Sequence, residues 1–454
     1  MPKVSIIMPS LNVAQYIREC MDSVVNQTLQ DIEILCVDAG STDGTLEILQ
    51  EYASKDSRIR IIRSKRRSYG FQVNLGIDSA KGEYLGVVET DDYIDPAMFQ
   101  KLYDTAIENK ADFVKSSYYL FADIPQVGRL KLEQNISGLP YMGRDRKCIS
   151  SEDYINQTTA LDPYIWNGIY KRDFVQTNSI RLNETPGAAY QDAGFRFQMA
   201  FLAQRGIIIP EAFYHYRRDN AGSSMYSPKG LQYDLQECQY IYNWMAGRFS
   251  GDEARMRAIS CHIASIFLET VQESALFANP DRQTLVEKFY KLLRICYDSG
   301  YLVQEDFPKE NWLELKMFLD NPVQFDSYIK LKAETEFKLY YDFLSLMRSK
   351  KEIIIYGCGT VGTRVCFLLH RNDISNIVYF CDSDSNKWGS KCMGKKILSP
   401  QEAILSYPNA FFLVANRGSY MEIMRVLINL NVPRDNMGIY RLSSDPLVCT
   451  SRFI

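Results

Sequence analysis

The sequence has little net charge, few histidines and no long apolar run, and each of these features excludes a class of protein. Lys and Arg total 52 against 55 for Asp and Glu, a net charge of −3, which is not the basic excess of a general nucleic-acid binder. The three histidines are too few for a histidine-based zinc site. The longest apolar runs, such as Ala410–Ala415, are too short to span a bilayer. The first residues resemble a strand and include no apolar stretch long enough for a signal peptide.

The cysteines show no spacing that indicates a metal site or a disulfide framework. There are 11 of them, an odd number, and no CxxC pair occurs. They are scattered through apolar segments, as Cys20, Cys36 and Cys366 are. We therefore expect reduced thiols inside protein cores and a cytoplasmic location.

The pattern of apolar residues divides the chain into three parts, which we expect to be domains of residues 1–224, 225–349 and 350–454. In the first part short apolar runs alternate with helical patterns, and strands are predicted at Val4–Met8, Ile32–Val37, Ile59–Ile62 and Tyr84–Val88. Such alternation predicts an α/β fold with a mostly parallel sheet. The middle part is predicted to be a helical connector without recognisable chemistry, and the last part returns to strand–helix alternation.

Polar side chains follow three of the predicted strands. Glu89, Asp91 and Asp92 come after the fourth strand, Asp38 after the second, and Pro9–Asn12 after the first. Because the carboxyl ends of parallel strands meet at one edge of a sheet, we expect these segments to face one crevice. Crowded carboxylates repel one another unless a cation lies between them, and Mg²⁺ shares such carboxylates with phosphates. The sequence predicts a metal–diphosphate site, with Asp91 or Asp92 as a cap of the next helix as the alternative.

The segments Val4–Asn12, Val37–Thr45 and Gly82–Asp92 resemble the motifs of family 2 glycosyltransferases in their order and spacing. The resemblance implies a GT-A nucleotide-sugar-binding fold for residues 1–224, with a mixed sheet, and sugar transfer that inverts the anomeric carbon. It implies Mg²⁺ or Mn²⁺ as cofactor, a nucleotide-sugar donor, and a saccharide or lipid-linked saccharide as acceptor. It also implies a bacterial enzyme of surface polysaccharide or glycolipid synthesis, whose membrane contact is at most peripheral.

The site residues of the family carry over onto five positions of these motifs. The resemblance implies that Pro9 and Asn12 line the nucleotide pocket and that Asp38 accepts a hydrogen bond from the base. It implies that Asp91 faces the ribose or the metal, and that Asp92 faces the metal and the diphosphate.

Three positions depart from the pattern of the family. The second acid of its Asp-Asp-Gly-Ser motif is Ala39 here, so one contact is missing. Glu89 stands where the family often has Asp. Gln72-Val73-Asn74 replaces a common Ala-Arg-Asn motif, and Lys65–Arg67 either supplies the missing basic contact or forms a solvated loop.

An inverting transfer needs a base that takes the proton of the acceptor hydroxyl. Asp192 lies at the start of a helical stretch, where the helix dipole favours the ionised carboxylate. The residues alone indicate a helix cap. The resemblance implies instead that Asp192 is the base, because the family commonly has Glu-Asp at this distance after the metal motif. Gln191 replaces that Glu here, which is expected to weaken the contact that orients the base and to leave the base in place.

Two further segments carry candidate binding residues. The family often has Tyr-Arg where Tyr216 and Arg217 stand, near a loop that closes over the donor. Arg217 or Arg218 would then offset charge on the departing diphosphate, unless the pair lies on a surface edge. Tyr164 and Trp166 either stack on an acceptor sugar or, in the case of Trp166, pack in the core.

The last part of the chain contains a glycine motif. Gly357, Gly359 and Gly362 fit the pattern GxGxxG between a predicted strand and helix, and Asp382 ends the next strand, where a ribose-binding acid sits in dinucleotide-binding folds. We expect a Rossmann-like domain at residues 350–454 that either binds NAD(P) or is a module without redox chemistry. An inverting glycosyltransferase is thus the first hypothesis. The alternatives are an NAD(P)-dependent or bifunctional sugar-modifying enzyme, and a degenerate transferase that acts as a binding scaffold.

Overall fold

The computed structural model describes residues 1–125, 127–134, 136, 147–155, 164–220, 222–223, 227–276, 279–416 and 418–440. The chain forms two units, each with its own apolar cores. The first comprises Met1–Leu120 and Glu133–Lys330, and the second comprises Phe121–Leu132 and the chain from Leu331 onward. The second unit is therefore built from two separate stretches of sequence.

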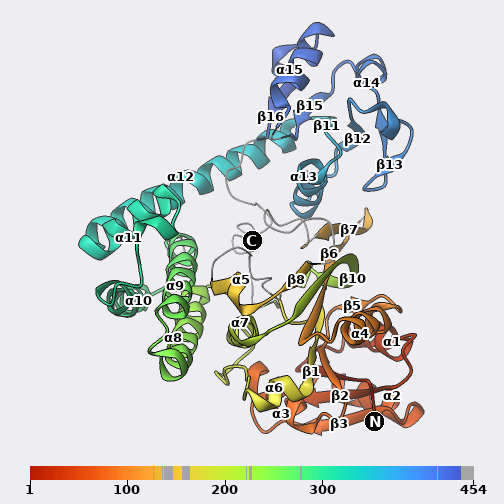
Figure 1. Cartoon of the computed structure of the whole chain (residues 1–454). Coiled ribbons are helices and arrows are strands. Elements are labelled where there is room, and N and C mark those ends of the chain that lie inside the picture. Colours follow the sequence, from red (N-terminus) through yellow and green to blue (C-terminus); the bar gives the residue numbers. More distant parts are fainter. Residues whose placement is uncertain are drawn as a thin grey trace. The chain divides into compact units, whose positions relative to one another are not determined.

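A mixed sheet forms the centre of the first unit (Figure 1). Parallel strands lie in the order β3-β2-β1-β4, with bounds Ile59–Arg63, Ile32–Asp38, Val4–Ser10 and Tyr84–Val87. Next to β4 the order continues through β9 (Gly168–Lys171), β6 (Phe113–Ile124), β10 (Gly206–Arg217) and β5 (Tyr93–Ile94). β9 is antiparallel to β4, while β7 (Gly128–Gln134) pairs with β6 and β8 (Lys147–Ile149) with β10. This arrangement confirms the predicted α/β fold with a mixed sheet.

Helices connect the strands in the order that the sequence predicts. Their bounds are α1 Ile17–Val25, α2 Thr45–Lys55, α3 Tyr69–Ser79, α4 Met98–Asn109, α5 Ser151–Ile155, α6 Arg172–Thr177 and α7 Asp192–Leu202. The buried residues of α1 are the predicted face, Ile17, Cys20, Met21 and Val24. The alternative that Asp91 or Asp92 caps the next helix is wrong, because Ala97 precedes α4 and no side chain caps it.

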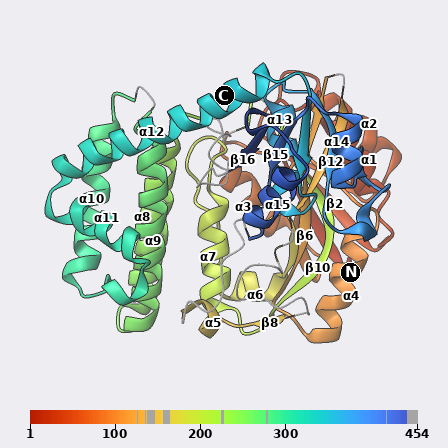
Figure 2. The ribbon, with the colours of Figure 1, turned by 90° about the horizontal axis from the view of Figure 1, so that it is seen from above.

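Helix α7 joins the sheet to the helical part of the chain (Figure 2). Its Phe195 and Met199 pack in the core under the sheet, together with Ile7 and Leu85. Its Phe197 and Phe201 belong to the core of the following helices. Because opposite faces of α7 are buried in two cores, the first residue of this helix, Asp192, is held in a fixed place.

The predicted helical part consists of long helices around an aromatic core. Their bounds are α8 Gly230–Phe249, α9 Glu253–Ser274, α10 Arg282–Asp298, α11 Lys309–Asp320 and α12 Pro322–Ser349. Phe267 is the centre of this core, with ring centroids of Phe289, Phe318 and Phe325 within 5.9 Å. The division between the two units falls within α12.

A second sheet forms the centre of the second unit. Its order is β13-β14-β12-β11-β15-β16, with bounds Lys391–Cys392, Lys395–Leu398, Ile377–Cys381, Ile353–Tyr356, Phe411–Val414 and Met437–Ile439. All neighbours are parallel except β13 and β14. The helices are α13 Thr360–Arg371, α14 Pro400–Ser406 and α15 Tyr420–Asn429. The predicted Rossmann-like domain is thus confirmed as a parallel sheet with a glycine turn after its central strand β11.

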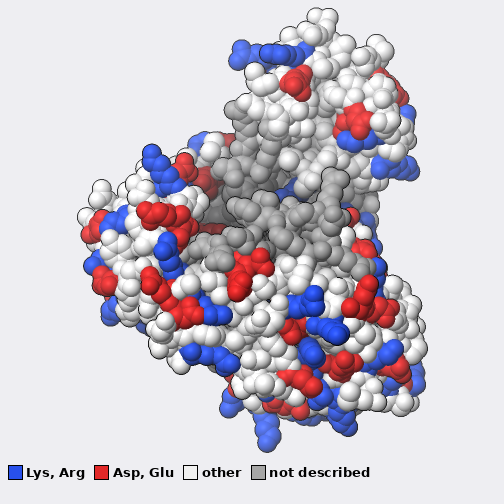
Figure 3. Space-filling view, in the orientation of Figure 1, with Lys and Arg blue, Asp and Glu red and all other residues white. Residues whose placement is uncertain are grey.

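Both charge signs occur side by side on one face of the first unit (Figure 3). On the face that Figure 3 shows, Lys and Arg side chains alternate with Asp and Glu side chains. This mixture agrees with the small net charge of the chain. None of the helices in the described part of the chain has the length and hydropathy that crossing a bilayer requires.

Candidate active site

The carboxyl ends of β1, β2 and β4 lie next to one another, as the sequence predicts, and hydrogen bonds tie their loops together. The Ala39 backbone N–H donates to the Ser10 carbonyl at 3.0 Å, and the Thr90 hydroxyl donates to the Pro9 carbonyl at 2.9 Å. The Gln72 amide donates to the carbonyl of Ser10 at 3.0 Å and to that of Val37 at 2.6 Å. Gln72, at the position of the missing Ala-Arg-Asn motif, thus holds two strand ends together.

Asp38 is buried and stabilises the turn that follows β2. Its Oδ2 accepts from the Gly40 backbone N–H at 2.9 Å, and its Oδ1 accepts from the Ser41 hydroxyl at 2.6 Å. Gly40 has φ of 84°, a left-handed conformation that suits glycine. These bonds favour a turn-stabilising role for Asp38. Its contact with a nucleotide base stays a prediction.

Asn12 is exposed and joins the loop after β1 to the same turn. Its backbone N–H donates to the Ser41 hydroxyl at 3.0 Å, and its Oδ1 accepts from the Thr42 backbone N–H at 2.9 Å. Pro9, by contrast, is buried at the end of β1. Of the two residues predicted to line a nucleotide pocket, Asn12 is the one with a side chain open to solvent.

Asp92 fastens the end of β10 to the end of β4. It is 1% exposed, and both of its carboxylate oxygens accept hydrogen bonds. Oδ2 accepts from the Tyr214 hydroxyl and Oδ1 from the Arg217 backbone N–H, each at 2.7 Å. Burial raises the pKa of Asp92 well above its ordinary value. This geometry favours a structural role, and the predicted contact of Asp92 with a metal stays a prediction.

Asp91 and Glu89 are the half-buried carboxylates of this edge. Asn220 Nδ2 donates to Asp91 Oδ2 at 2.7 Å, and burial raises the pKa of Asp91. Burial is also the main cause that raises the pKa of Glu89 to about 8, and the charges of Asp91 and Asp192 add to it. The Tyr69 hydroxyl donates to Glu89 Oε1 at 2.5 Å.

The donor set fits a divalent cation that substrate phosphates also bind. A cation between Glu89 and Asp91 would relieve the repulsion and the burial cost that raise their pKa values. Within the described ranges, no group of three or more His, Cys, Asp and Glu side chains could hold a metal by itself. Mg²⁺ usually takes one or two carboxylates and completes its shell with water and phosphate oxygens.

Arg217 is buried under this edge and positions Asp91. Its Nε donates to the Asp91 carbonyl at 2.8 Å, and its Nη2 donates to Glu19 Oε2 at 2.7 Å. The guanidinium also lies 4.6 Å from the ring centroid of Tyr16. These partners already balance the charge of Arg217. Its predicted role toward a diphosphate therefore stays a prediction.

Asp192 lies on the same side as Glu89, although it is far away in the sequence. The segment before α7 pairs with the segment before α3, since the Tyr69 backbone N–H donates to the Gly187 carbonyl at 2.8 Å. The charge of Asp192 raises the pKa of both Glu89 and Tyr69. The pKa of Asp192 is itself raised, mainly by burial, while the charges of Arg196 and Lys115 oppose that change.

Gln191 holds the loop in front of Asp192. Its amide donates to the Thr185 carbonyl at 2.7 Å, to the Thr185 hydroxyl at 2.9 Å and to the Gly187 carbonyl at 3.2 Å. Its Oε1 accepts from the Ala189 backbone N–H at 3.2 Å. An amide is required here because an ionised Glu has no hydrogen to donate to carbonyl oxygens.

Aromatic side chains pack behind the strand ends. Trp166 is buried, and its ring stacks on Tyr214 at 4.1 Å and on Tyr164 at 4.5 Å between centroids. This is the core-packing alternative for Trp166. Tyr164 is only half-buried, with its ring centroid 5.5 Å from that of Tyr216, and it stays a candidate for contact with a sugar.

Two residues near Asp192 were missed by the sequence interpretation. Tyr69 has no motif around it, and only the fold brings it to Glu89. Glu237 of α8 is 3% exposed, and its Oε1 accepts from Asn183 Nδ2 at 2.8 Å. Burial and then the charge of Asp192 raise the pKa of Glu237 to about 8. The signal available in the sequence was an acid beside Cys238, on the buried face of an amphipathic helix.

The glycine turn of the second unit has the geometry of its motif. Gly357 has φ of 109°, and a Cβ on Gly362 would lie 1.8 Å from the Gly357 carbonyl oxygen. A Cβ on Gly359 would meet no atom within 4 Å. The turn thus needs glycine at two positions for its own fold, while Gly359 faces open space.

Asp382 is bonded to the glycine turn and its neighbours. Its Oδ2 accepts from the Cys358 backbone N–H at 3.0 Å and from Lys387 Nζ at 3.1 Å. Its Oδ1 accepts from the Asp384 backbone N–H at 2.9 Å, and the Trp388 indole donates to its carbonyl at 2.8 Å. A ribose hydroxyl would have to compete with these bonds, so NAD(P) binding stays a prediction.

Known proteins resemble both parts of the chain. Residues 5–162 match the family described as Glycosyl transferase family 2, and residues 349–437 match the family C2185-like, N-terminal. The uncharacterized glycosyltransferase EpsJ of Bacillus subtilis is 34% identical over 220 residues, which are 48% of this chain and 62% of that protein. Glycosyltransferase GlyA of Streptococcus pneumoniae is 27% identical over 368 residues, 72% of this chain and 51% of that protein. The chain thus spans less than two thirds of the length of each of these relatives.

The fold has counterparts among solved structures. Residues 1–349 of S. aureus TarS match 74% of this chain and 91% of that chain, with a TM-score of 0.54 and 16% identity. The same protein in complex with UDP-GlcNAc matches with a TM-score of 0.55. Together with the matched family and the strand order, this similarity confirms the predicted fold. The N-terminal part of the chain thus has the fold of this TarS domain, and residues 5–162 are similar to family 2 glycosyltransferases.

Proposed function

We propose that this protein is an inverting glycosyltransferase. It would move a sugar from a nucleotide-diphosphate donor to a hydroxyl of a saccharide or lipid-linked saccharide, in the synthesis of a bacterial polysaccharide or glycolipid. One observation carries the proposal: the segment before α7, which leads to Asp192, pairs with the segment before α3, whose Tyr69 hydroxyl donates to Glu89 Oε1 at 2.5 Å. The glycosyltransferase names of its relatives and the UDP-GlcNAc complex of TarS support it.

In this mechanism the Asp192 carboxylate accepts the proton of the acceptor hydroxyl while that oxygen bonds to the anomeric carbon. The bond between the anomeric carbon and the diphosphate oxygen breaks, and both of its electrons leave with the nucleoside diphosphate. A Mg²⁺ or Mn²⁺ ion, when bound, would neutralise the charge on that diphosphate. Asp91 and Glu89 would hold this ion, and Asp92 and Arg217 would keep Asp91 in place.

The first test replaces Asp192 with Asn. We expect sugar transfer to fall by about 10²–10⁴-fold, the usual contribution of a general base. Donor binding should survive, as measured by thermal stabilisation with a panel of nucleotide sugars with and without Mn²⁺. Asp173→Asn is the matched control, because Asp173 is exposed on α6. Equal transfer by wild type and Asp192→Asn would exclude Asp192 as the base.

The two alternative functions, a binding scaffold and a nicotinamide-dependent enzyme, predict different results in the same assay. A scaffold that kept only the fold would neither hydrolyse nor transfer sugar from any donor of the panel. A nicotinamide-dependent enzyme would require NAD(P) at the glycine turn, whose Gly359 faces open space. The hydrogen bonds that occupy Asp382 favour the module without redox chemistry.

A further inference from the structure

Tyr69 lies between the carboxylates at the end of β4 and the loop that precedes α7. It is the first residue of α3, whose N-cap is Ser68. Its backbone N–H donates to the Gly187 carbonyl at 2.8 Å, and its side-chain hydroxyl donates to Glu89 Oε1 at 2.5 Å. One residue thus contacts both parts of the candidate active site.

Close packing fixes the start of α3 against the segment that leads to this loop. A Cβ on Gly70 would lie 1.8 Å from the Asn183 carbonyl oxygen, so this approach requires glycine. Asn74 is buried, and its side chain binds Leu182 twice. Its Nδ2 donates to the Leu182 carbonyl and its Oδ1 accepts from the Leu182 backbone N–H, each at 3.0 Å. These contacts restrict the backbone that carries Tyr69.

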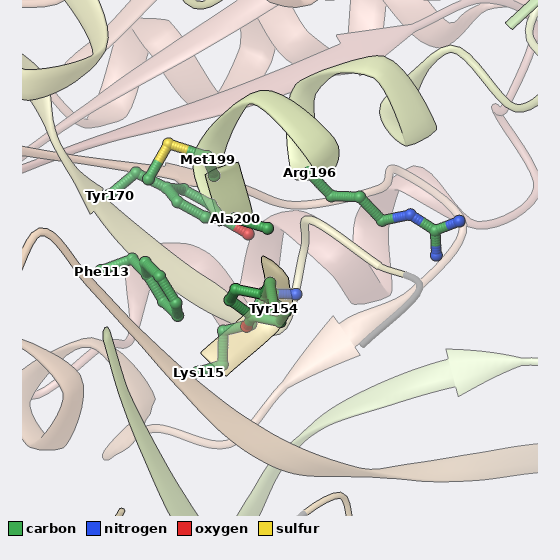
Figure 4. A pocket seen from close by; sticks show the side chains of 7 residues that line it. All are labelled: Phe113, Lys115, Tyr154, Tyr170, Arg196, Met199 and Ala200. Carbon is green, nitrogen blue, oxygen red and sulfur yellow. The ribbon is translucent and has the colours of Figure 1, made fainter. Parts of the chain in front are cut away.

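The ring of Tyr69 is held as well, because it packs against the core under the sheet. Three members of that core, Phe113, Tyr170 and Met199, line a small cavity and are grouped on one side of it in Figure 4. Since both the ring and the backbone of Tyr69 are held, little side-chain entropy is lost when its hydroxyl binds an acceptor. The hydroxyl is therefore suited to hold a partner in one position.

Glu89 uses one of its two carboxylate oxygens within the fold. Oε1 accepts the hydrogen bond from Tyr69, whereas Oε2 has no hydrogen-bond partner among the described residues. The Glu89 backbone N–H donates to the Tyr214 hydroxyl at 3.0 Å, so the main chain is fixed at this point. A glutamate has one more rotatable bond than an aspartate, and the bond from Tyr69 limits the positions that its carboxylate can take.

We propose that Tyr69 is a positioning residue of the candidate metal site: its hydroxyl holds Glu89 Oε1 and so leaves Oε2 to a divalent cation. The inference rests on the proposed function, in which Glu89 and Asp91 hold that cation. Carboxylates that bind a metal are themselves hydrogen-bonded to partners that orient them. Loss of such a partner usually weakens metal binding by about 10–100-fold.

The test measures Mn²⁺ binding by the full-length protein through the electron paramagnetic resonance signal of free Mn²⁺, alone and with each nucleotide sugar of the panel. Tyr69→Phe removes the hydroxyl and keeps the ring. We expect the dissociation constant of this variant for Mn²⁺ to be about tenfold higher than that of wild type, or more. Tyr103→Phe is the matched control and should bind Mn²⁺ as wild type does. The Tyr103 hydroxyl donates to Glu83 Oε2 at 2.8 Å, at the other end of β4.

A double substitution shows whether Tyr69 acts through Glu89. In a Glu89→Gln background, Tyr69→Phe should not weaken Mn²⁺ binding any further, because its partner carboxylate is already gone. Excess Mn²⁺ should restore most of the transfer by Tyr69→Phe, since a positioning residue does not touch the reacting atoms.

Four results would overturn the positioning role. They are equal Mn²⁺ binding by wild type and Tyr69→Phe, further weakening in the Glu89→Gln background, transfer that stays low at saturating Mn²⁺, and a wild type that binds no Mn²⁺ with any nucleotide. A purely structural role gives the first of these results, with a lower melting temperature of Tyr69→Phe in the absence of Mn²⁺. Unchanged transfer by Asp192→Asn would instead overturn the proposed function.

Discussion

At the scale of single residues, the site depends on carboxylates that the fold removes from water. Asp92 and Glu237 are almost completely buried, and burial is the largest cause of their raised pKa values. A raised pKa of an acid means that the folded state binds protons more tightly than the unfolded chain. Such residues make the fold less stable once pH exceeds their ordinary pKa, because the unfolded chain then loses the proton more readily than the folded state does. Raised pKa values of this kind are common at functional sites.

Glu237 gives a pH-dependent prediction. Its pKa rises from 4.5 to about 8 on folding, so its contribution to stability falls as pH rises from about 4.5 through 8. Glu237→Gln removes this loss and keeps an oxygen for Asn183. We expect the variant to gain a few kcal/mol relative to wild type between pH 5 and pH 8, at about 1.4 kcal/mol per pKa unit. Thermal unfolding at several pH values measures the difference.

The control for this experiment is Glu287→Gln, at an exposed position of α10. Its difference from wild type should not change with pH. A pH-independent difference for Glu237→Gln would show that Glu237 is ionised throughout, contrary to its burial.

The sequence predicted those residues whose role depends on local pattern or on a motif. The buried face of α1 follows from spacing alone, and the strand-end acids follow from their place after apolar runs. Tyr69 and Glu237 could not be found in this way, because their partners are remote in the chain. Glu237 and Asn183, for example, are 54 positions apart.

At the scale of elements, α7 and the loop before it determine where Asp192 lies. Gln191 binds three oxygens of this loop through its amide, and it is buried. Resemblance to the family suggested that Gln191 weakens the site because Glu is common there. The hydrogen bonds indicate the opposite, since the loop of this chain presents acceptors that only an amide can satisfy.

We therefore expect glutamate, the residue common in the family at the position of Gln191, to destabilise this protein. Gln191→Glu would place a carboxylate against two carbonyl oxygens and a hydroxyl, and unsatisfied buried groups cost about 1–3 kcal/mol each. We expect a lower melting temperature and weaker transfer. Exposed Gln204→Glu is the matched control and should behave as wild type. A Gln191→Glu variant as stable as wild type would mean that the loop rearranges freely.

At the scale of the whole molecule, two units with separate cores predict two unfolding transitions. The parallel sheet of the second unit was predicted correctly, because its strands are apolar and its glycine turn has a recognisable pattern. Its composition from two stretches, Phe121–Leu132 and the chain from Leu331, was not predicted. Periodicity describes single elements and carries no information about which distant segments pack together.

A pair of glycine variants separates these transitions. Gly362→Ala places a Cβ 1.8 Å from the Gly357 carbonyl oxygen. We expect this change to lower the free energy of unfolding of the second unit by about 3 kcal/mol. Gly359→Ala meets open space and should leave both transitions unchanged. Scanning calorimetry of the full chain measures both. Nucleotide sugars with Mn²⁺ should raise only the melting temperature of the first unit. A single unfolding transition in every variant would contradict the presence of two separate units.

The bond between Trp388 and the Asp382 carbonyl gives the second unit an optical reporter of its own. The chain has four tryptophans, and Trp166, Trp244 and Trp312 all belong to the first unit. Trp388 is partly exposed, and its indole is bonded to the residue that closes the glycine turn. In a variant that keeps this one indole, emission intensity would reveal whether any dinucleotide, sugar nucleotide or partner ever enters that turn, without a label and without knowing the ligand beforehand.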